Sequence, residues 1–378
     1  MSIIIGADIV PTSQNQKWFE NGSAEKLAGS ELLDILKKAD YRIFNLEVPL
    51  ADQEKPISKM GPNLIATTAS VEAMKAMGID LLTLANNHIM DQDAQGFEST
   101  VRTLEKAGIA YTGAGHELRE ACKPWFVNIK GKRYGIYACA EHEFSIAKAD
   151  YPGANPFDCL ESLDHISEMK RQCDYAIVLY HGGKEHYRYP SPYLQKVCRR
   201  IVDKGADLVI CQHSHCIGCK EAYLQGTIIY GQGNFIFEDQ DNEFWNTSLL
   251  VKIDDNSEIS YIPLKRQNSG TRTVTGDEAK EILEAFIRRS AEIADPQFVE
   301  KQYRAFARSN LKQYLNYFSG KQNRFMFKVI NKLSGHRYEN YSSERYKRKT
   351  GAGIRNYIEC EAHRELITEG LKEDDFQK

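Results

Sequence analysis

The chain has no run of about 18 consecutive apolar residues, the minimum length of a membrane-spanning helix. Its first residues, MSIIIGADIVPT, contain no basic leader, no long apolar stretch and no small-residue cleavage site. We therefore interpret them as a first β-strand rather than a signal peptide. The nine cysteines are an odd number scattered through a long chain, which argues against a secreted disulfide framework. The sequence predicts a cytoplasmic protein with reduced thiols.

Internal repeats and low-complexity segments are also missing, and the charge of the whole chain is nearly balanced. With 378 residues, of which 42% are hydrophobic, the chain is long enough for one large domain or two smaller ones. The net charge of −3 says little about partners. Residues 300–349 differ from the rest, because they contain thirteen Lys or Arg residues and three acids.

Short β-branched runs alternate with helix-like segments through residues 1–265. The run SIIIGADIV (2–10), for example, precedes the amphipathic AEKLAGSELLDILKKA (24–39). This alternation predicts a layered α/β domain. The stretches PWFVNIKGKRYGIYACAE (124–141), TIIYGQGNFIFE (227–238) and TSLLVKIDD (247–255) predict hairpin strands, with the first turn at Gly131-Lys132. We therefore expect mixed sheets flanked by helices rather than one parallel sheet.

From Asp277 the pattern becomes helical, and the polar, turn-rich NSGTRTVTG (268–276) precedes it. We predict a first domain over residues 1–267 and a basic helical C-terminal extension over 276–378. The favoured reading of the extension is a helical cap with a solvated basic face. Contact with a membrane surface of acidic lipids, with an anionic polymer or with a capsule synthase is a second reading. Nucleic acid is third, because no binding motif is present.

Side chains that can bind metals follow the predicted strands. They are carboxylates, imidazoles and amides, and no cluster of arginines that could bind a phosphate accompanies them. Ligands bind at the carboxyl ends of strands in open α/β sheets, and this set of donors suits divalent metals. The candidates are Asp8, Asn45, Glu47, Asn86, Asn87, His88, His181, His213 and His215.

Six motifs together resemble bacterial capsule-synthesis proteins of the CapA type, a family linked to poly-γ-glutamate capsule production. They occur in the family's order over residues 2–253: GADIV, NLEVPL, ANNHIMD, HGGKEHYRYPSPYLQ, GADLVICQHSH and IIYGQGNFIFE. The family is similar to the calcineurin-like metallophosphatases. The resemblance implies a layered metallophosphoesterase fold and a site for two divalent cations, Mn, Zn or Fe.

The same resemblance implies a role for each candidate by position. Asp8 and His215 would bind one metal, and Glu47 would bridge both. The second metal would be bound by Asn87, His181 and His213. His88 would be the general acid that protonates a leaving oxygen, oriented by Asp91. Predicted substrate-binding residues are Asn45, Asn86, Glu185, Tyr187 and Asn234.

Two positions depart from the metallophosphatase pattern. Val10 stands where the third residue of Asp-x-His is expected, which removes an imidazole from the first metal. Gln212 replaces the usual glycine before the histidine pair.

Simpler readings exist for several candidates. Asn86 and Asn87 are also typical turn residues. Asp91 or Asp93 could cap the helix that follows, and Glu47 could be a solvated loop carboxylate. Cys216-x-x-Cys219, with His213 and His215, offers a cramped structural zinc site as a rival.

Three functions follow as hypotheses. The first is a metal-dependent hydrolase of phosphoesters or phosphodiesters in capsule or envelope polymer biosynthesis. The second is a non-catalytic assembly factor that binds a polymer or a synthase, which Val10 favours. The third is a hydrolase of the γ-glutamyl amide bond, which rests on the family's capsule association alone.

Overall fold

The computed structural model describes residues 2–237, 242–318, 325–335, 337, 348–360, 362–364 and 367. The chain divides into two compact units, Met1–Glu300 and Lys301–Lys378. This division falls later than the predicted link at 268–276. That stretch holds a strand of the first unit, and the helix after it packs into the same unit through Phe286, which is fully buried. The sequence pattern changes from mixed strands and helices to helices near residue 277, but the first compact unit extends to Glu300.

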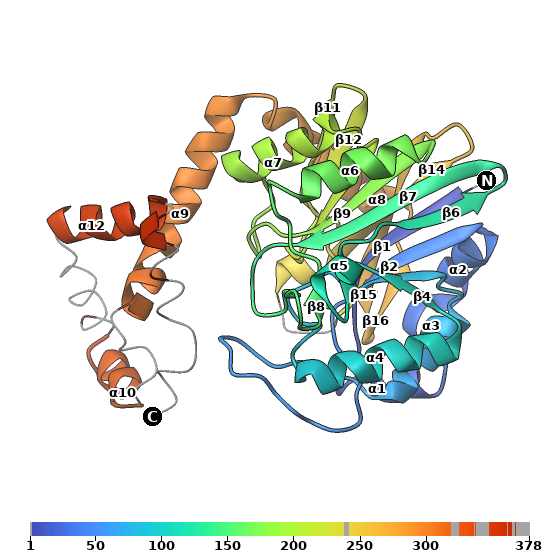
Figure 1. Cartoon of the computed structure of the whole chain (residues 1–378), viewed down its shortest axis with the longest axis horizontal. Helices are drawn as coiled ribbons and strands as arrows, with labels where there is room; N and C mark the ends of the chain where they lie inside the picture. Colours follow the sequence, from blue (N-terminus) through green and yellow to red (C-terminus); the bar gives the residue numbers. More distant parts are fainter. Residues whose placement is uncertain are drawn as a thin grey trace. The chain divides into compact units, whose positions relative to one another are not determined.

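The larger sheet of the first unit is mixed (Figure 1). Its path is β16-β15-β14-β1-β2-β3-β4, and β13 also pairs with β1. The neighbours β1, β2, β3 and β4 are parallel, whereas β14, β15 and β16 continue as antiparallel strands. The strands are β1 (Ser2–Val10), β2 (Tyr41–Leu46), β3 (Leu81–Thr83), β4 (Ala110–Thr112), β13 (Asn234–Phe237), β14 (Thr247–Asp254), β15 (Ile259–Gln267) and β16 (Gly270–Thr273).

The second sheet is mixed as well, with the order β11-β12-β10-β9-β7-β6. Its central strands β7, β9, β10 and β12 are parallel, and an antiparallel strand lies at each edge. The strands are β6 (Trp125–Ile129), β7 (Lys132–Ala140), β9 (Tyr175–His181), β10 (Leu208–Gln212), β11 (Lys220–Tyr223) and β12 (Gly226–Ile229). The short pair β5 (Ala114–Gly115) and β8 (Gly153–Ala154) lies apart from both sheets. The predicted α/β fold of mixed sheets flanked by helices is confirmed.

Helices of the first unit are α1 (Gln16–Glu20), α2 (Ala24–Lys38), α3 (Val71–Ala76), α4 (Asp93–Ala107), α5 (Leu118–Ala121), α6 (Ser162–Arg171), α7 (Pro192–Asp203) and α8 (Gly276–Glu292). The short 3-10 helices η1 (Thr68–Ser70) and η2 (Glu243–Trp245) also belong to it. α9 (Pro296–Phe318) begins in the first unit and continues into the second. The second unit also contains α10 (Phe325–Leu333) and α12 (Arg348–Glu359).

Local sequence explains where several helices begin and end. Ser191 accepts a hydrogen bond from the Leu194 N–H at 3.0 Å, and Pro192 follows as the first residue of α7. A serine cap followed by proline satisfies and pre-organises the first turn of a helix. At the other end of α4, Gly108 takes a left-handed conformation with φ of 72°, which ends the helix.

Alternate residues of the second sheet face two different hydrophobic clusters. Ile177 and Leu179 of β9 join the core between the two sheets, whereas Val178 and Tyr180 pack toward α6 and α7. This period of two is the expected consequence of strand geometry. The sheets therefore lie face to face, and helices cover the outer side of the second one (Figure 1).

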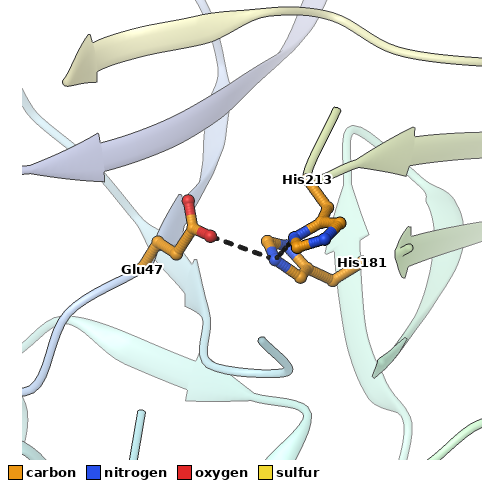
Figure 2. A group of neighbouring side chains, drawn as sticks. All are labelled: Glu47, His181 and His213. Atoms are coloured by element: carbon orange, nitrogen blue, oxygen red, sulfur yellow. Dashed lines mark hydrogen bonds and ion pairs between the residues drawn. The ribbon is translucent and has the colours of Figure 1, made fainter. Parts of the chain in front are cut away.

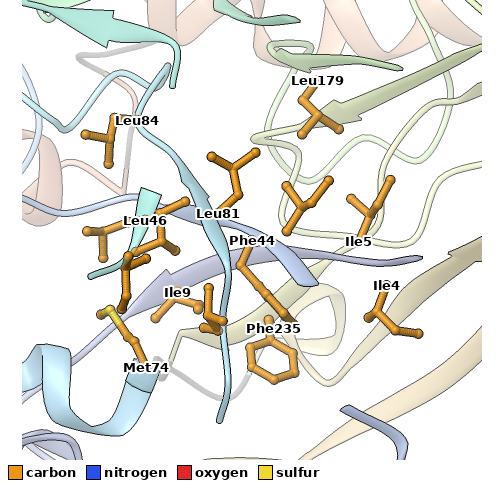
Figure 3. Packing of buried hydrophobic residues seen from close by; sticks show 14 of the residues in the cluster. Ile4, Ile5, Ile9, Phe44, Leu46, Met74, Leu81, Leu84, Leu179 and Phe235 are labelled. Atoms are coloured by element: carbon orange, nitrogen blue, oxygen red, sulfur yellow. The ribbon is translucent and has the colours of Figure 1, made fainter. Parts of the chain in front are cut away.

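The core between the sheets is closely packed. Figure 3 shows Ile5, Phe44 and Leu179, which come from both sheets, in one group with Phe235. The rings of Phe44 and Phe235 lie with centroids 4.5 Å apart. A Cβ atom at Gly6 would come within 2.0 Å of the Phe44 ring, so only glycine fits at this point of β1.

Of the three stretches predicted as hairpin strands, two are confirmed and one is wrong. Residues 247–254 form β14, which pairs antiparallel with β15. Residues 124–141 form β6 and β7, joined by a turn in which Lys130 and Gly131 have positive φ. Residues 227–238 do not form a hairpin, because β12 lies in the second sheet and β13 pairs with β1 in the first. Gly231 and Gly233, both with positive φ, let the chain cross between the sheets there. Glu238, the last residue of that prediction, lies outside the described residues.

No helix in the described ranges is both long and apolar enough to cross a membrane.

Candidate metal centre

The carboxyl ends of the parallel strands of both sheets meet at one place. Asp8 comes from β1 and pairs in register with Asn45 of β2, while His181 ends β9. His213 and His215 follow β10 directly. These side chains are almost completely buried, with exposed fractions between 0% and 7%. The convergence follows from the topology, because parallel strands of a sheet end at the same edge.

The first cluster of candidate ligands surrounds one nitrogen (Figure 2). His181 Nε2 lies 3.1 Å from Glu47 Oε1, 3.1 Å from Asn87 Oδ1 and 3.1 Å from His213 Nδ1. A neutral imidazole nitrogen carries at most one proton, so it cannot donate to all of these neighbours. An arrangement of electron-pair donors around a shared centre is what a cation requires. We call these four residues the His181 group.

The second cluster contains Asp8, Glu47 and His215, whose ligand atoms all lie within 4.8 Å of one another. His215 Nδ1 is 3.9 Å from Asp8 Oδ2 and 2.9 Å from Asn234 Oδ1. We call Asp8, Glu47 and His215 the Asp8 group. Glu47 belongs to both groups, which is the position of a bridging carboxylate.

The protein satisfies the buried carboxylates only in part. Asp8 Oδ2 and both oxygens of Glu47 are buried without a hydrogen bond. Burial raises the pKa of Asp8 to about 7, helped by the nearby Glu47 carboxylate. Burial also raises the pKa of Glu47 and lowers that of His181 to about 4. Buried unpaired carboxylates are costly unless a cation neutralises them, so the residues present fit bound divalent metals.

His88 and Asp91 form a hydrogen-bonded pair beside the His181 group. His88 Nδ1 lies 2.6 Å from Asp91 Oδ2, which also accepts from the Leu64 N–H at 2.7 Å. Asp91 is fully buried, and His88 follows Asn87 directly in the sequence. His88 and Asp91, the predicted acid and orienting residue, are thus in direct contact through Nδ1, and Nε2 is the other ring nitrogen.

Lys59 was not recognised from the sequence. Its ammonium bonds to Asp91 Oδ1 and lies 3.2 Å from His88 Nδ1, with a side chain only 2% exposed. It is carried by the loop 51–66, which docks on the start of α4. The Ile57 N–H donates to the Asp91 carbonyl, and the Lys55 N–H donates to Gln92 Oε1. The sequence signal was weak, because a lone lysine in a polar loop normally points into solvent.

Asn45 and Asn86 form hydrogen bonds that hold the candidate ligands in position. Asn45 Nδ2 donates to Asp8 Oδ1 at 2.8 Å, and its Oδ1 accepts from Asn86 Nδ2 at 3.1 Å and from Thr83. Asn86 also donates to the Leu46 carbonyl and accepts from the His88 N–H. Both asparagines are fully buried. This burial favours a positioning role over the predicted contact with substrate.

The other predicted substrate-binding residues differ in their setting. Glu185 is 44% exposed and lies 4.0 Å from His213 Nε2, at the open side of the His181 group. Tyr187 packs edge-on against Tyr189, with ring centroids 6.0 Å apart. Asn234 is 6% exposed and contacts His215, so it lies beside the Asp8 group.

The backbone around the histidines is strained. His186, His213 and His215 have φ values of 57°, 90° and 54°, in the left-handed region that residues with a Cβ rarely adopt. Such conformations cost on the order of 1–3 kcal/mol each and concentrate at functional sites. The strain here is expected where the backbone orients imidazole side chains toward a site.

The rival zinc site is not assembled. The groups with metal-binding geometry in the described part of the chain contain no cysteine. Cys216 and Cys219 are fully buried, and burial raises the pKa of both thiols. Cys219 packs in the hydrophobic cluster under α7. These cysteines therefore behave as small apolar residues of the core.

The two departures from the metallophosphatase pattern have structural explanations. Val10 is 2% exposed and packs in the core between the sheets. Gln212 crosses between the sheets, since its amide donates to the Gly6 carbonyl at 3.1 Å and to Gln232 Oε1 at 3.3 Å. The glutamine thus ties β10 to β1 directly beneath the histidines.

The sequence of the chain matches one known protein family over more than half of its length. Residues 3–239 match the family described as "Bacterial capsule synthesis protein PGA_cap". The chain belongs to this family. The match covers all the residues of the His181 group and the Asp8 group.

Curated relatives agree with the family. The chain is 32% identical over 253 residues to the capsule biosynthesis protein CapA of Bacillus anthracis, covering 64% of this chain and 61% of that protein. It is 28% identical over 273 residues to the PGA biosynthesis protein CapA of Bacillus subtilis (strain 168), covering 68% and 66%. The chain thus spans less than two thirds of the length of either relative.

The solved structures it resembles are distant. A hypothetical protein from Thermus thermophilus matches with a TM-score of 0.46 and 13% identity, over 71% of this chain and 100% of that chain. The NAD nucleotidase of Haemophilus influenzae matches with a TM-score of 0.44 and 13% identity, over 75% and 61%. At these scores the likeness carries no information on activity.

Proposed function

We propose that the chain is a metal-dependent hydrolase that cleaves a phosphoester or phosphodiester during biosynthesis of a capsule or envelope polymer. The observation that supports this most directly is the position of Glu47, shared by two groups of buried ligands. Two divalent cations (Mn, Zn or Fe) bound there would supply Lewis acidity and an activated water. The family membership supports the pathway, because the relatives named above are capsule and PGA biosynthesis proteins.

The residues of the chain have separate roles in this proposal. His88 donates a proton from Nε2 to the leaving oxygen, and Asp91 orients the imidazole through a hydrogen bond to its other ring nitrogen, Nδ1. Asn45 holds the Asp8 carboxylate in place, and Glu185 lines the open side. The buried setting excludes water from the ligands, which strengthens every electrostatic interaction among them.

The test combines metal content with turnover. Metal per chain is measured by plasma mass spectrometry on tag-free protein purified without chelators, followed by a screen of phosphomonoesters and phosphodiesters. Glu47→Ala should lose metal and turnover together, and His88→Ala should keep metal and lose roughly 100- to 10,000-fold in rate. His116→Ala, a histidine that is 46% exposed, is the matched control. Full activity in both site variants would exclude this mechanism.

An accessory role without catalysis is the second candidate. A further relative, from Mycobacterium tuberculosis, is named a probable polyglutamine synthesis accessory protein. Phosphate or phenol released from esters supports the proposed hydrolase, and free amino groups released from polyglutamate support an amide hydrolase. Tight polymer binding with neither product supports the accessory role.

The basic C-terminal helices are proposed to contact a membrane surface of acidic lipids, an anionic polymer or a capsule synthase. Residues of the second unit include exposed apolar side chains at Leu311, Tyr314 and Leu333, interspersed with lysines and arginines. Several aromatics of this region, among them Phe318, Phe325 and Phe327, have side chains outside the described residues. Binding to anionic vesicles should weaken steeply with salt, and a flat salt dependence would exclude an electrostatic contact. A cytoplasmic, membrane-peripheral location is part of this proposal, and cell fractionation tests it.

A further inference from the structure

The two groups of ligands are unequal. The His181 group offers four donors, including the amide oxygen of Asn87, whereas the Asp8 group offers three. The imidazole that the metallophosphatase pattern would add at the first strand is replaced by Val10, which is packed in the core. A further protein ligand for the Asp8 group must therefore come from another segment of the chain.

Asn234 lies where such a ligand is needed. β13 runs parallel to β1, and Asn234 is the register partner of Asp8, at an irregularity of the pairing between Asp8 and Ile9. Gly233, directly before it, has φ of 79°, and a Cβ there would come within 2.6 Å of the Thr247 carbonyl oxygen. The chain is thus bent so that β13 begins beside the Asp8 carboxylate.

The contact of Asn234 repeats that of Asn87. Asn234 Oδ1 lies 2.9 Å from His215 Nδ1, just as Asn87 Oδ1 lies 3.1 Å from His181 Nε2. His215 Nδ1 is also the nitrogen that faces the Asp8 carboxylate, at 3.9 Å. A cation on this nitrogen uses its lone pair and leaves it without a proton. The amide oxygen then has no hydrogen bond to accept and faces the cation itself.

The second atom of the amide points to the same conclusion. Asn234 is 6% exposed, and its Nδ2 is buried without a hydrogen-bond partner. A buried amide nitrogen without a partner costs on the order of 1–3 kcal/mol. This cost is expected where the amide oxygen of the same residue has a role other than hydrogen bonding, such as binding a cation.

We propose that Asn234 is the fourth protein ligand of the cation held by Asp8, Glu47 and His215, bound through its amide oxygen. This inference rests on the proposed function, since it requires a two-cation site. Each cation is then bound by one amide oxygen, and the neutral amide adds a ligand without adding a third carboxylate beside Asp8 and Glu47.

The competing role is that of an outer residue that only orients His215 by accepting a proton from Nδ1. Affinity alone does not separate the two roles, because loss of an orienting residue also weakens metal binding about 10- to 100-fold. The number of water molecules on the cation does separate them. A lost ligand is replaced by water, whereas a lost orienting residue leaves the coordination positions filled as before.

The experiment uses the full chain loaded with Mn²⁺, with isothermal titration for affinity and water-proton relaxation for the number of bound waters. Asn234→Ala should retain one tight cation and bind the other at least ~10-fold more weakly, with one additional water on it. Asn234→Asp should retain both cations, because a carboxylate oxygen replaces the amide oxygen. Asn155→Ala removes another buried asparagine, 1% exposed and outside both groups, and should change neither quantity.

Two results would overturn the inference. One is an Asn234→Ala protein that binds both cations as tightly as wild type. The other is weaker binding with an unchanged number of waters, which assigns Asn234 the orienting role. A wild-type chain that binds fewer than two cations is a different outcome, because it removes the proposed function itself together with this inference.

Discussion

Lys59→Met should destabilise the protein strongly, because it breaks a buried ion pair and leaves one charge behind. The Lys59 side chain is 2% exposed and its partner Asp91 is 0% exposed. Removing one partner of a buried pair typically costs about 3–5 kcal/mol. Asp91 keeps its hydrogen bonds to His88 and to the Leu64 N–H, which offset part of the loss. We therefore expect a decrease of about 3 kcal/mol in the free energy of unfolding.

The same loop provides a matched control. Lys55 also pairs with an aspartate at the start of α4, Asp93, at 2.8 Å, but the two side chains are 54% and 27% exposed. Exposed pairs contribute only about 0–1 kcal/mol, so Lys55→Met should be nearly neutral. Urea unfolding of the full chain, followed by far-ultraviolet circular dichroism in the presence of a chelator, measures both variants.

A double variant keeps the reasoning testable when Lys59→Met fails to fold. Lys59→Met with Asp91→Asn removes both charges and should recover most of the lost stability. Equal effects of Lys59→Met and Lys55→Met would refute the argument from burial. A double variant that is no more stable than Lys59→Met would show that the uncompensated charge of Asp91 is not the cause.

Three further results are expected. In chelated protein, the stability of wild type relative to Asp8→Asn should fall as the pH rises from about 4 to about 7. Burial raises the Asp8 pKa from 3.8 to about 7, so the folded chain retains a proton that the unfolded chain releases. Thermal unfolding at a series of pH values measures this difference in stability, and a difference that stays constant with pH would contradict the prediction. Adding cation to about 100 times its dissociation constant should stabilise wild type by about 2.7 kcal/mol per site, and Glu47→Ala should abolish most of this gain in the same assay. Replacing Cys216 and Cys219 by serine should leave the metal content unchanged, and loss of a metal would revive the zinc alternative.

Position along the strands was enough to find most of the candidate ligands. Asp8 lies two residues before the end of β1, His181 ends β9, and His213 and His215 follow β10. Parallel strands bring such ends together whatever their order in the sheet. The structure confirms that these side chains meet. Their assignment to metal remains a prediction, which the metal measurements above test.

What the sequence could not show depends on contacts between distant segments. The crossing from β12 to β13 has no local signal beyond two glycines, yet it brings Asn234 beside Asp8. Lys59 lies in a loop whose docking depends on hydrogen bonds to Asp91 and Gln92, more than 30 residues later. The compact first unit extends beyond the predicted link at 268–276 for the same reason, since the burial of Phe286 is a tertiary property.

The charge balance of the proposed two-cation site would favour a phosphoryl substrate over an amide. The buried carboxylates that face the two groups are Asp8 and Glu47, and the nearby charge of Asp91 is paired with Lys59. Two divalent cations on these ligands would leave an excess of about two positive charges in a setting of low dielectric. An excess of that size attracts and orients a phosphoester, which carries its negative charge on the reacting group itself. The bond of a γ-glutamyl amide is neutral, and the carboxylates of that polymer lie away from it. With two cations bound as proposed, the buried carboxylates Asp8 and Glu47 would thus favour a reacting group that is anionic.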